Sequence, residues 1–167
     1  KGFEAGADAS ELDLQQSVHG ELIVHHDYAL GRPDNGSGDI FEKSLAEIQQ
    51  VDAGSWFSQK FKAERIPTLQ QVFDLFGEAI EYEIELKEST VEFLERVIKV
   101  VLDYKLLQQV EFTSPHLFLL GKLKQICPQA KTGAFFKPYP EWMSQNQGKR
   151  IVLNTLMVLP ADVAHLP

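Results

Sequence analysis

Two stretches of the chain alternate charged and apolar residues, and this alternation constrains the fold more than any other feature. In residues 9–15, Glu11 and Asp13 take one face of an extended chain and leucines take the other, because successive side chains of a strand point to opposite sides. In residues 82–87, Glu85 shares one face with two further charged residues. Carboxylates on an otherwise apolar strand need water or a cation, because an unpaired buried charge is costly. We expect a cation.

Strand-like and helix-like stretches alternate along most of the chain. The strand-like stretches are residues 10–15, 21–26, 81–87, 110–113, 131–136 and 151–156. Capping boxes begin helices at Ser44 and Thr68, and longer helical patterns cover residues 89–104 and 116–127. The connections are mostly short, which is typical of βα units around a parallel sheet. In residues 21–26 we expect Leu22, Val24 and His26 to share a face.

Length and composition narrow the class of protein. A chain of 167 residues suits one domain with a sizeable core. The net charge of −8 argues against a sequence-independent nucleic-acid binder, which needs a basic surface. A single cysteine permits no internal disulfide, which favours a reducing, cytoplasmic location. Neither a secretory signal peptide nor an apolar run near the roughly 18 residues of a membrane span is visible.

Charged residues late in several strands indicate a site, because the catalytic residues of parallel α/β barrels lie where the strands end. Glu11, Asp13 and Glu85 offer only oxygen ligands, which suit Mg²⁺ or Ca²⁺ rather than zinc. His26 is a candidate general acid or base beside such a metal. Lys87 is a candidate for holding an anionic substrate group. Together they predict a metal-assisted reaction on a phosphate ester or an acid.

Three other interpretations remain open from the residues alone. A Glu-x-Asp pair is often only the solvated face of a hairpin. A barrel that abstracts a proton beside a carboxylate, with Mg²⁺ and with Lys87 as the base, uses the same residue types. A degenerate barrel that binds a partner without chemistry is the third.

The aromatic residues Trp56, Phe57 and Phe61 lie in a region without a clean period. They form either a small satellite core or the lining of a pocket. We expect Cys127 to be a buried small hydrophobic residue, because it follows the apolar stripe of the preceding helix. No role is assigned to His19, which lies in a turn, to His25, which faces away from His26, or to His116 and His165, for which no charged neighbours are expected.

Six motifs, in this order, resemble the glycerophosphodiester phosphodiesterase family, densely from residue 2 to residue 87. They are Gly6-Ala7-Asp8 through Glu11-Leu12-Asp13, Ile23-Val24-His25-His26-Asp27, Asn35-Gly36-Ser37-Gly38, Asp52-Ala53-Gly54-Ser55-Trp56-Phe57, Glu64-Arg65-Ile66-Pro67-Thr68-Leu69 and Ile84-Glu85-Leu86-Lys87. The resemblance implies a (β/α)8 barrel with an insertion, residues 32–64, near its mouth. It also implies hydrolysis of glycerophosphodiesters to glycerol 3-phosphate and an alcohol, with a divalent cation, Mg²⁺ or Ca²⁺.

The resemblance also assigns roles to residues. It implies metal ligands at Glu11, Asp13 and Glu85, one of two acid/base histidines at His26, and a phosphate contact at Lys87. By a weaker transfer, Trp56 and Phe57 shape the wall against the glycerol part. The expected partner is therefore a small glycerophosphodiester. From the charge and the hydropathy, no nucleic-acid partner and no membrane span are expected.

Residues 1–167 are expected to form a single partial barrel domain, an incomplete barrel that lacks the first and last strands. The family's His-Arg-Gly strand, which supplies the other histidine, would precede Lys1, and its last strand would follow Pro167. We expect such a chain to be inactive or nearly so. The gap would expose apolar faces and strand edges, which favours self-association through the open barrel edge.

Overall fold

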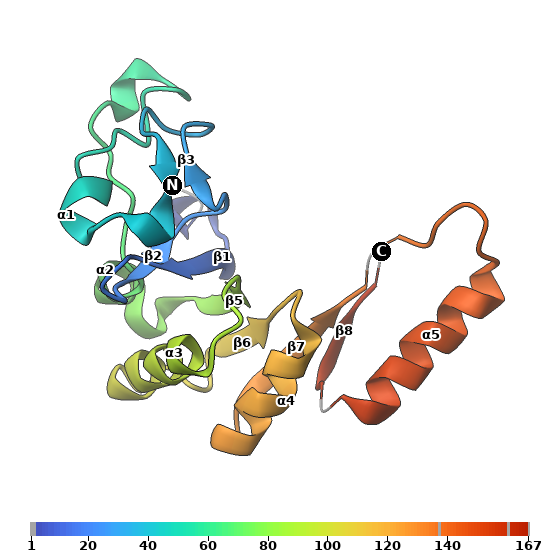
Figure 1. The fold of residues 1–167 in the computed structure, drawn as a ribbon. Helices are drawn as coiled ribbons and strands as arrows, with labels where there is room; N and C mark the ends of the chain where they lie inside the picture. The colour runs from blue at the N-terminus through green and yellow to red at the C-terminus, as the bar shows by residue number, and fades with distance from the viewer. Residues whose placement is uncertain (1–2, 137, 160, 167) are drawn as a thin grey trace. The chain divides into compact units, whose positions relative to one another are not determined.

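The structure is a computed structural model that describes residues 3–136, 138–159 and 161–166 (Figure 1). The chain divides into two compact units, Lys1–Ile80 and Glu81–Pro167. Figure 1 colours the elements of both units in chain order.

The first unit is built on short antiparallel strands. Its elements are η1 (Phe3–Ala5), β1 (Ala9–Gln16), β2 (Leu22–Val24), β3 (Ala29–Leu30), β4 (Gly38–Asp39), η2 (Ile40–Glu42), α1 (Leu45–Ile48), η3 (Gln59–Phe61), α2 (Leu69–Phe76) and η4 (Gly77–Ala79). β1 pairs antiparallel with β2, with Leu14 opposite Val24. β3 pairs antiparallel with β4.

The capping boxes predicted at Ser44 and Thr68 are both present, and they begin α1 and α2. In α2, Leu69 and Phe73 are fully buried, and the helix ends at Gly77, whose positive φ suits a residue without a Cβ. The chain before α2 is tied to β2, because the amide of Val24 donates to the carbonyl of Pro67. The capping box at Thr68 therefore predicted the start of α2 correctly.

A small hydrophobic core lies under the loops of the first unit. Partly buried Leu45 and Ala53 pack against it, and its buried members are Ile23, Leu30, Ile40, Ile48, Val51 and Ile66. Three of these six buried residues and both partly buried ones come from the predicted insertion, so this loop-rich segment is held largely by its own apolar contacts. The boundaries of the insertion, residues 32–64, stay a prediction.

The second unit is a parallel sheet with helices between its strands. Its elements are β5 (Glu81–Leu86), α3 (Val91–Asp103), β6 (Val110–Thr113), α4 (Leu117–Ile126), β7 (Lys131–Phe135), α5 (Gln145–Val158) and β8 (Val163–His165). β5, β6, β7 and β8 pair in that order, all parallel. The register places Glu85 beside Thr113, Thr113 beside Gly133, and Phe135 beside His165.

Burial in the second unit follows the predicted periods. β5 alternates between exposed or half-buried glutamates and buried apolar residues, as its sequence predicts. α3 is capped by Thr90 and buries the stripe of Leu94, Val97, Ile98 and Val101. α4 packs on α3 and ends at Cys127, which is buried as expected.

The prediction of a strand at residues 151–156 is wrong, because this segment lies inside α5. A short apolar run fits a strand and a helix equally well when only its period is considered. The deciding local signal was Ser144, whose hydroxyl accepts from the amide of Gln147 while the Gln147 side chain accepts from the Ser144 amide. This capping box begins α5, and the strand that pairs with β7 lies later, at Val163–His165.

The second predicted strand is shorter than expected. β2 ends at Val24, and the chain then bends, so the alternation predicted to place His26 beside Leu22 and Val24 stops there. His25 is buried and His26 is exposed. The prediction of a shared face for His26 is therefore wrong.

Candidate functional site

The two acidic residues of β1 lie on one face of the strand. Glu11 is exposed, Asp13 is half-buried, and Leu14 on the opposite face is fully buried. The amide of His25 donates to the carbonyl of Asp13 at 2.9 Å, which ties the middle of β1 to the chain that follows β2. The predicted strand therefore presents its two carboxylates together.

Glu85 and Lys87 form an ion pair at the end of β5. The Lys87 Nζ lies 3.0 Å from Glu85 Oε1, and the two side chains are 10% and 21% exposed. Partial burial strengthens such a pair relative to a surface pair, because less water screens it. Lys87 is consequently a held positive charge beside a carboxylate.

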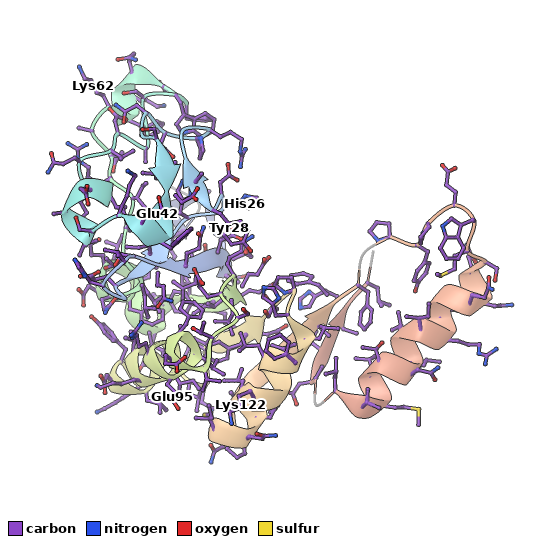
Figure 2. All side chains as sticks on the ribbon, in the orientation of Figure 1. His26, Tyr28, Glu42, Lys62, Glu95 and Lys122 are labelled. Atoms are coloured by element: carbon purple, nitrogen blue, oxygen red, sulfur yellow. The ribbon has the colours of Figure 1, made fainter. Side chains whose placement is uncertain are left out.

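His26, labelled in Figure 2, lies on the first unit and contacts a charged neighbour, Asp27. Its Nδ1 lies 2.6 Å from Asp27 Oδ1, and Arg32 contacts both oxygens of Asp27 through Nε at 2.5 Å and Nη2 at 2.7 Å. The hydrogen bonds with Arg32 and then His26 lower the pKa of Asp27 well below its usual range, and Asp27 raises the pKa of Arg32. Asp27 is therefore a carboxylate, and it accepts the Nδ1–H of His26. This leaves Nε2 of His26 directed to other partners.

The sequence analysis assigned no role to Asp27, although this residue pairs with His26 in the structure. It follows His26 directly, and neighbours in a strand would point apart. Only the bend after β2 brings the two side chains together. The available signal was the Arg32 five residues later, which pairs with Asp27.

His25, to which no role was assigned, anchors the loop after β3. Its Nε2 lies 3.1 Å from Asp34 Oδ2 and its Nδ1 lies 2.8 Å from the Asp27 carbonyl. The other oxygen of Asp34 accepts from the amides of Gly31 and Gly36. Both His25 and Asp34 are buried, so the pair holds this loop from the inside.

Trp56 and Phe57 lie on a loop that Asp52 organises. Asp52 accepts from the amides of Gly54, Ser55 and Ala63 and from the Ser55 hydroxyl, and these bonds, led by the Ser55 amide, lower its pKa well below the usual range. The indole of Trp56 donates to the Ala53 carbonyl at 2.9 Å.

The two aromatic side chains of this loop are held by each other and by Phe61. The rings of Trp56 and Phe57 are 5.8 Å apart, and Phe57 lies 5.8 Å from Phe61. Trp56 and Phe57 are nevertheless 62% and 70% exposed. They therefore form an aromatic surface rather than a closed core.

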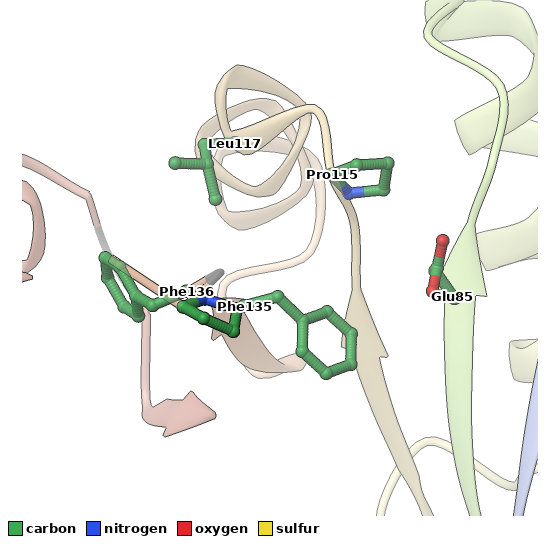
Figure 3. A pocket seen from close by; sticks show the side chains of 6 residues that line it. Glu85, Pro115, Leu117, Phe135 and Phe136 are labelled. Atoms are coloured by element: carbon green, nitrogen blue, oxygen red, sulfur yellow. The ribbon is translucent and has the colours of Figure 1, made fainter. Parts of the chain in front are cut away.

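A pocket of about 510 Å³ lies at the carboxyl ends of β5, β6 and β7 in the second unit. Figure 3 shows Pro115 and Leu117 on one side, Phe135 and Phe136 on the other, and Glu85 at the end of β5. Pro138 completes the lining. Apart from Glu85, none of these residues was predicted, because nothing local marks a side chain as part of a pocket.

A second charged cluster lies on the same face of the sheet as Glu85. Glu111 on β6 contacts His165 Nε2 at 2.7 Å through Oε1 and Lys131 Nζ at 2.8 Å through Oε2. Burial raises the pKa of Glu111, but the hydrogen bonds from Lys131 and His165 outweigh it and the pKa lies below the usual value. The expectation that His165 lacks a charged neighbour is therefore wrong.

The predicted site residues fall in both units. The first unit holds Glu11, Asp13, His26, Trp56 and Phe57, and the second holds Glu85 and Lys87.

Among the residues that the structure describes, no helix is both long enough and apolar enough to span a membrane.

The chain is similar to known phosphodiesterases. A glycerophosphodiester phosphodiesterase of Caldanaerobacter subterraneus subsp. tengcongensis is 36% identical over 141 residues, which are 82% of this chain and 58% of that protein. The chain thus spans less than two-thirds of that relative's length.

Two solved structures share the fold. A phosphodiesterase of Oleispira antarctica, determined with its product sn-glycerol-3-phosphate, is 26% identical, with a TM-score of 0.75 over 98% of this chain and 64% of that one. The Thermotoga maritima glycerophosphodiester phosphodiesterase is 22% identical, with a TM-score of 0.72 over 99% of this chain and 63% of that one.

Parallel strands that alternate with helices, together with these likenesses, give the fold class as an incomplete (β/α)8 barrel, as predicted. The model of the glycerophosphoryl diester phosphodiesterase family matches residues 1–120, which is more than half of the chain. The chain belongs to the glycerophosphoryl diester phosphodiesterase family.

Proposed function

We propose that the protein to which this chain belongs hydrolyses glycerophosphodiesters to glycerol 3-phosphate and an alcohol. Family membership supports the reaction class, and the Oleispira relative binds the product sn-glycerol-3-phosphate. The observation that carries the proposal for this chain is the Glu85–Lys87 pair at a strand end, beside a pocket. A carboxylate with a held ammonium suits an anionic phosphodiester better than a neutral substrate.

The proposed cofactor is one divalent cation, Mg²⁺ or Ca²⁺, bound by Glu11, Asp13 and Glu85. The donor set fits such an ion, because it is made only of carboxylate oxygens, two of them on one face of β1. A bound divalent cation polarises phosphoryl oxygens and offsets the charge that develops on them. Both Mg²⁺ and Ca²⁺ are proposed as candidates for this ion.

Four side chains have proposed roles beyond the metal. Lys87 binds a phosphate oxygen through Nζ, which lies 3.0 Å from Glu85 Oε1. His26 transfers a proton through Nε2, and the bond of Nδ1 to Asp27 orients its ring. Trp56 and Phe57 of the insertion contact the glycerol part.

We propose that the 167-residue chain by itself hydrolyses slowly or not at all. Loss of one member of an acid/base pair lowers a rate by about 10² to 10⁴. The second histidine that the family resemblance implies has no counterpart assigned within residues 1–167. The location of the protein in the cytoplasm stays a prediction.

Self-association through the open barrel edge is part of the same proposal. Its support is the set of exposed apolar side chains on α5, which are Ile151, Leu153, Met157 and Val158. Multi-angle light scattering at several concentrations tests it. A monomer at all concentrations would count against it.

The test of the reaction is release of glycerol 3-phosphate from glycerophosphocholine, followed by ³¹P NMR with Mg²⁺, with Ca²⁺ and with a chelator. A longer protein that contains this chain should turn the substrate over only with metal. Full turnover by the 167-residue chain would refute its proposed inactivity, and no hydrolysis by the longer protein would refute the function.

The test of the ligand set is calorimetric titration of the chain with each cation. Glu85→Gln should weaken the affinity for the cation at least tenfold, because it removes one charged ligand. Glu95→Gln on the exposed face of α3 is the matched control and should change nothing. Unchanged affinity in Glu85→Gln would remove Glu85 from the ligand set.

A further inference from the structure

The pocket beside Glu85 is apolar apart from that carboxylate. Its other lining residues are Pro115, Leu117, Phe135, Phe136 and Pro138. No other charged side chain is among its described lining residues. A concave apolar site with one polar end typically binds a ligand that is itself apolar with one polar end.

The wall of this pocket is held in place by the Glu111–His165 pair. The ring of Phe135 lies 4.7 Å from the ring of His165, centroid to centroid. Glu111 fixes His165 through the 2.7 Å contact with Nε2, and the amide of Phe136 donates to the His165 carbonyl at 3.0 Å. Both pocket phenylalanines are therefore positioned before a ligand arrives, which lowers the entropic cost of binding.

The position of Glu85 determines which part of the substrate enters. In the proposed function Lys87 contacts the phosphate and Glu85 is a ligand of the cation beside it, so the group that extends from them along the pocket is one of the two ester substituents. Glycerol has hydroxyl groups that would lose their water without gaining partners on this wall. An apolar alcohol group has no such hydroxyl groups to desolvate, and removing its apolar surface from water is favourable.

We propose that this pocket binds the alcohol group of the diester, and that the substrate class is glycerophosphodiesters of apolar alcohols, with an alkyl or aryl group. This inference rests on the proposed function. A quaternary ammonium such as choline is the rival occupant, because aromatic faces attract it. The prolines and Leu117 offer no such attraction, and they make up half of the lining.

The test measures binding rather than turnover. The chain, with Ca²⁺ present, is titrated calorimetrically with the glycerophosphodiesters of ethanolamine, choline, 1-butanol and 1-hexanol. Each methylene buried in the pocket should tighten the dissociation constant about fourfold, so the hexyl diester should bind roughly tenfold or more tightly than the butyl diester. The ethanolamine diester should bind most weakly.

Substitutions test whether the alcohol group binds in this pocket. Phe135→Ala should weaken binding of the hexyl diester about tenfold and leave the ethanolamine diester unchanged. Phe135→Leu retains apolar volume and should lose less, which separates the pocket from a folding defect. Phe118→Ala is the matched control, because Phe118 is an exposed phenylalanine of α4 outside the pocket lining.

Three outcomes would overturn the inference: equal affinity for the hexyl and ethanolamine diesters, tightest binding of the choline diester, or binding of none. The hydrolysis assay with glycerophosphocholine reports separately on the proposed function. If the chain preferred the hexyl diester but the longer protein did not hydrolyse glycerophosphocholine, the pocket assignment would stand and the proposed reaction would be refuted. If the longer protein hydrolysed it but the hexyl diester were not preferred, the reaction would stand and the pocket assignment would be refuted.

Discussion

Glu111 and His165 lie on strands that are not neighbours, yet Glu111 Oε1 and His165 Nε2 are 2.7 Å apart. β7 separates their strands, and the pair meets over Gly133. A Cβ on Gly133 would lie 2.4 Å from Glu111 Oε1 and 2.6 Å from His165 Nε2. The missing side chain is what permits the contact, and through it the placement of Phe135.

Gly133→Ala should therefore displace this pair and lower the free energy of unfolding by about 1–3 kcal/mol, the usual cost of overpacking. Gly121→Ala is the control, because a Cβ at this position in α4 meets nothing within 4 Å and alanine favours a helix by about 1 kcal/mol. Urea denaturation of both variants measures the difference. If Gly133→Ala were as stable as the unsubstituted chain or more stable, the close approach of Glu111 and His165 over Gly133 would be contradicted.

Asp27→Asn should change the tautomer of His26. The Asp27 carboxylate accepts Nδ1–H, so neutral His26 should carry its proton on Nδ1, and an amide removes this constraint. Long-range ¹H–¹⁵N NMR of the imidazole distinguishes the two forms. His19, which lies outside this group, should be unaffected. If His26 kept one tautomer in both proteins, Asp27 would not orient it.

Acidification should loosen the loop that carries Trp56. The pKa of Asp52 is lowered in the folded protein, so its stabilising bonds are complete above the ordinary aspartate pKa of about 4 and are lost as the pH falls towards the lowered value. In a Trp142→Phe background, Trp56 fluorescence should change reversibly below about pH 4. Asp52→Asn should show the altered emission already at neutral pH. Unchanged Trp56 emission in Asp52→Asn at neutral pH would contradict this role for Asp52.

Ser114→Ala should destabilise the chain by about 1–3 kcal/mol, because buried partners lose a hydrogen bond. The Ser114 hydroxyl donates to the Leu86 carbonyl at 2.9 Å and accepts from the His116 amide at 3.0 Å, which joins β5 to the start of α4. Ser89→Ala is the control, since Ser89 is exposed and should change stability by less than about 0.5 kcal/mol. Thermal denaturation of both compares them, and equal melting temperatures would argue against the bridge.

The sequence predicted the parts of the candidate site that follow a local period. Glu85 and Lys87 are two apart at the end of β5, so the alternation of the strand predicts that they share one side, where they form their ion pair. The pairing of His26 with Asp27 could not be predicted in this way, because the side chains of adjacent residues in a strand point to opposite faces. These two side chains meet because β2 ends before them, at Val24. The pocket beside Glu85 was likewise missed, since its walls come from three strand ends.

What the sequence determined by itself is the set of elements with strong local signals. β1, β5, α2 and α3 each have a clear period or cap, and their energies depend on residues within a few positions. The tertiary structure decided what depends on register. Glu111 meets His165, 54 residues later, only because three parallel strands pair in one alignment and the middle one has a glycine at the crossing point.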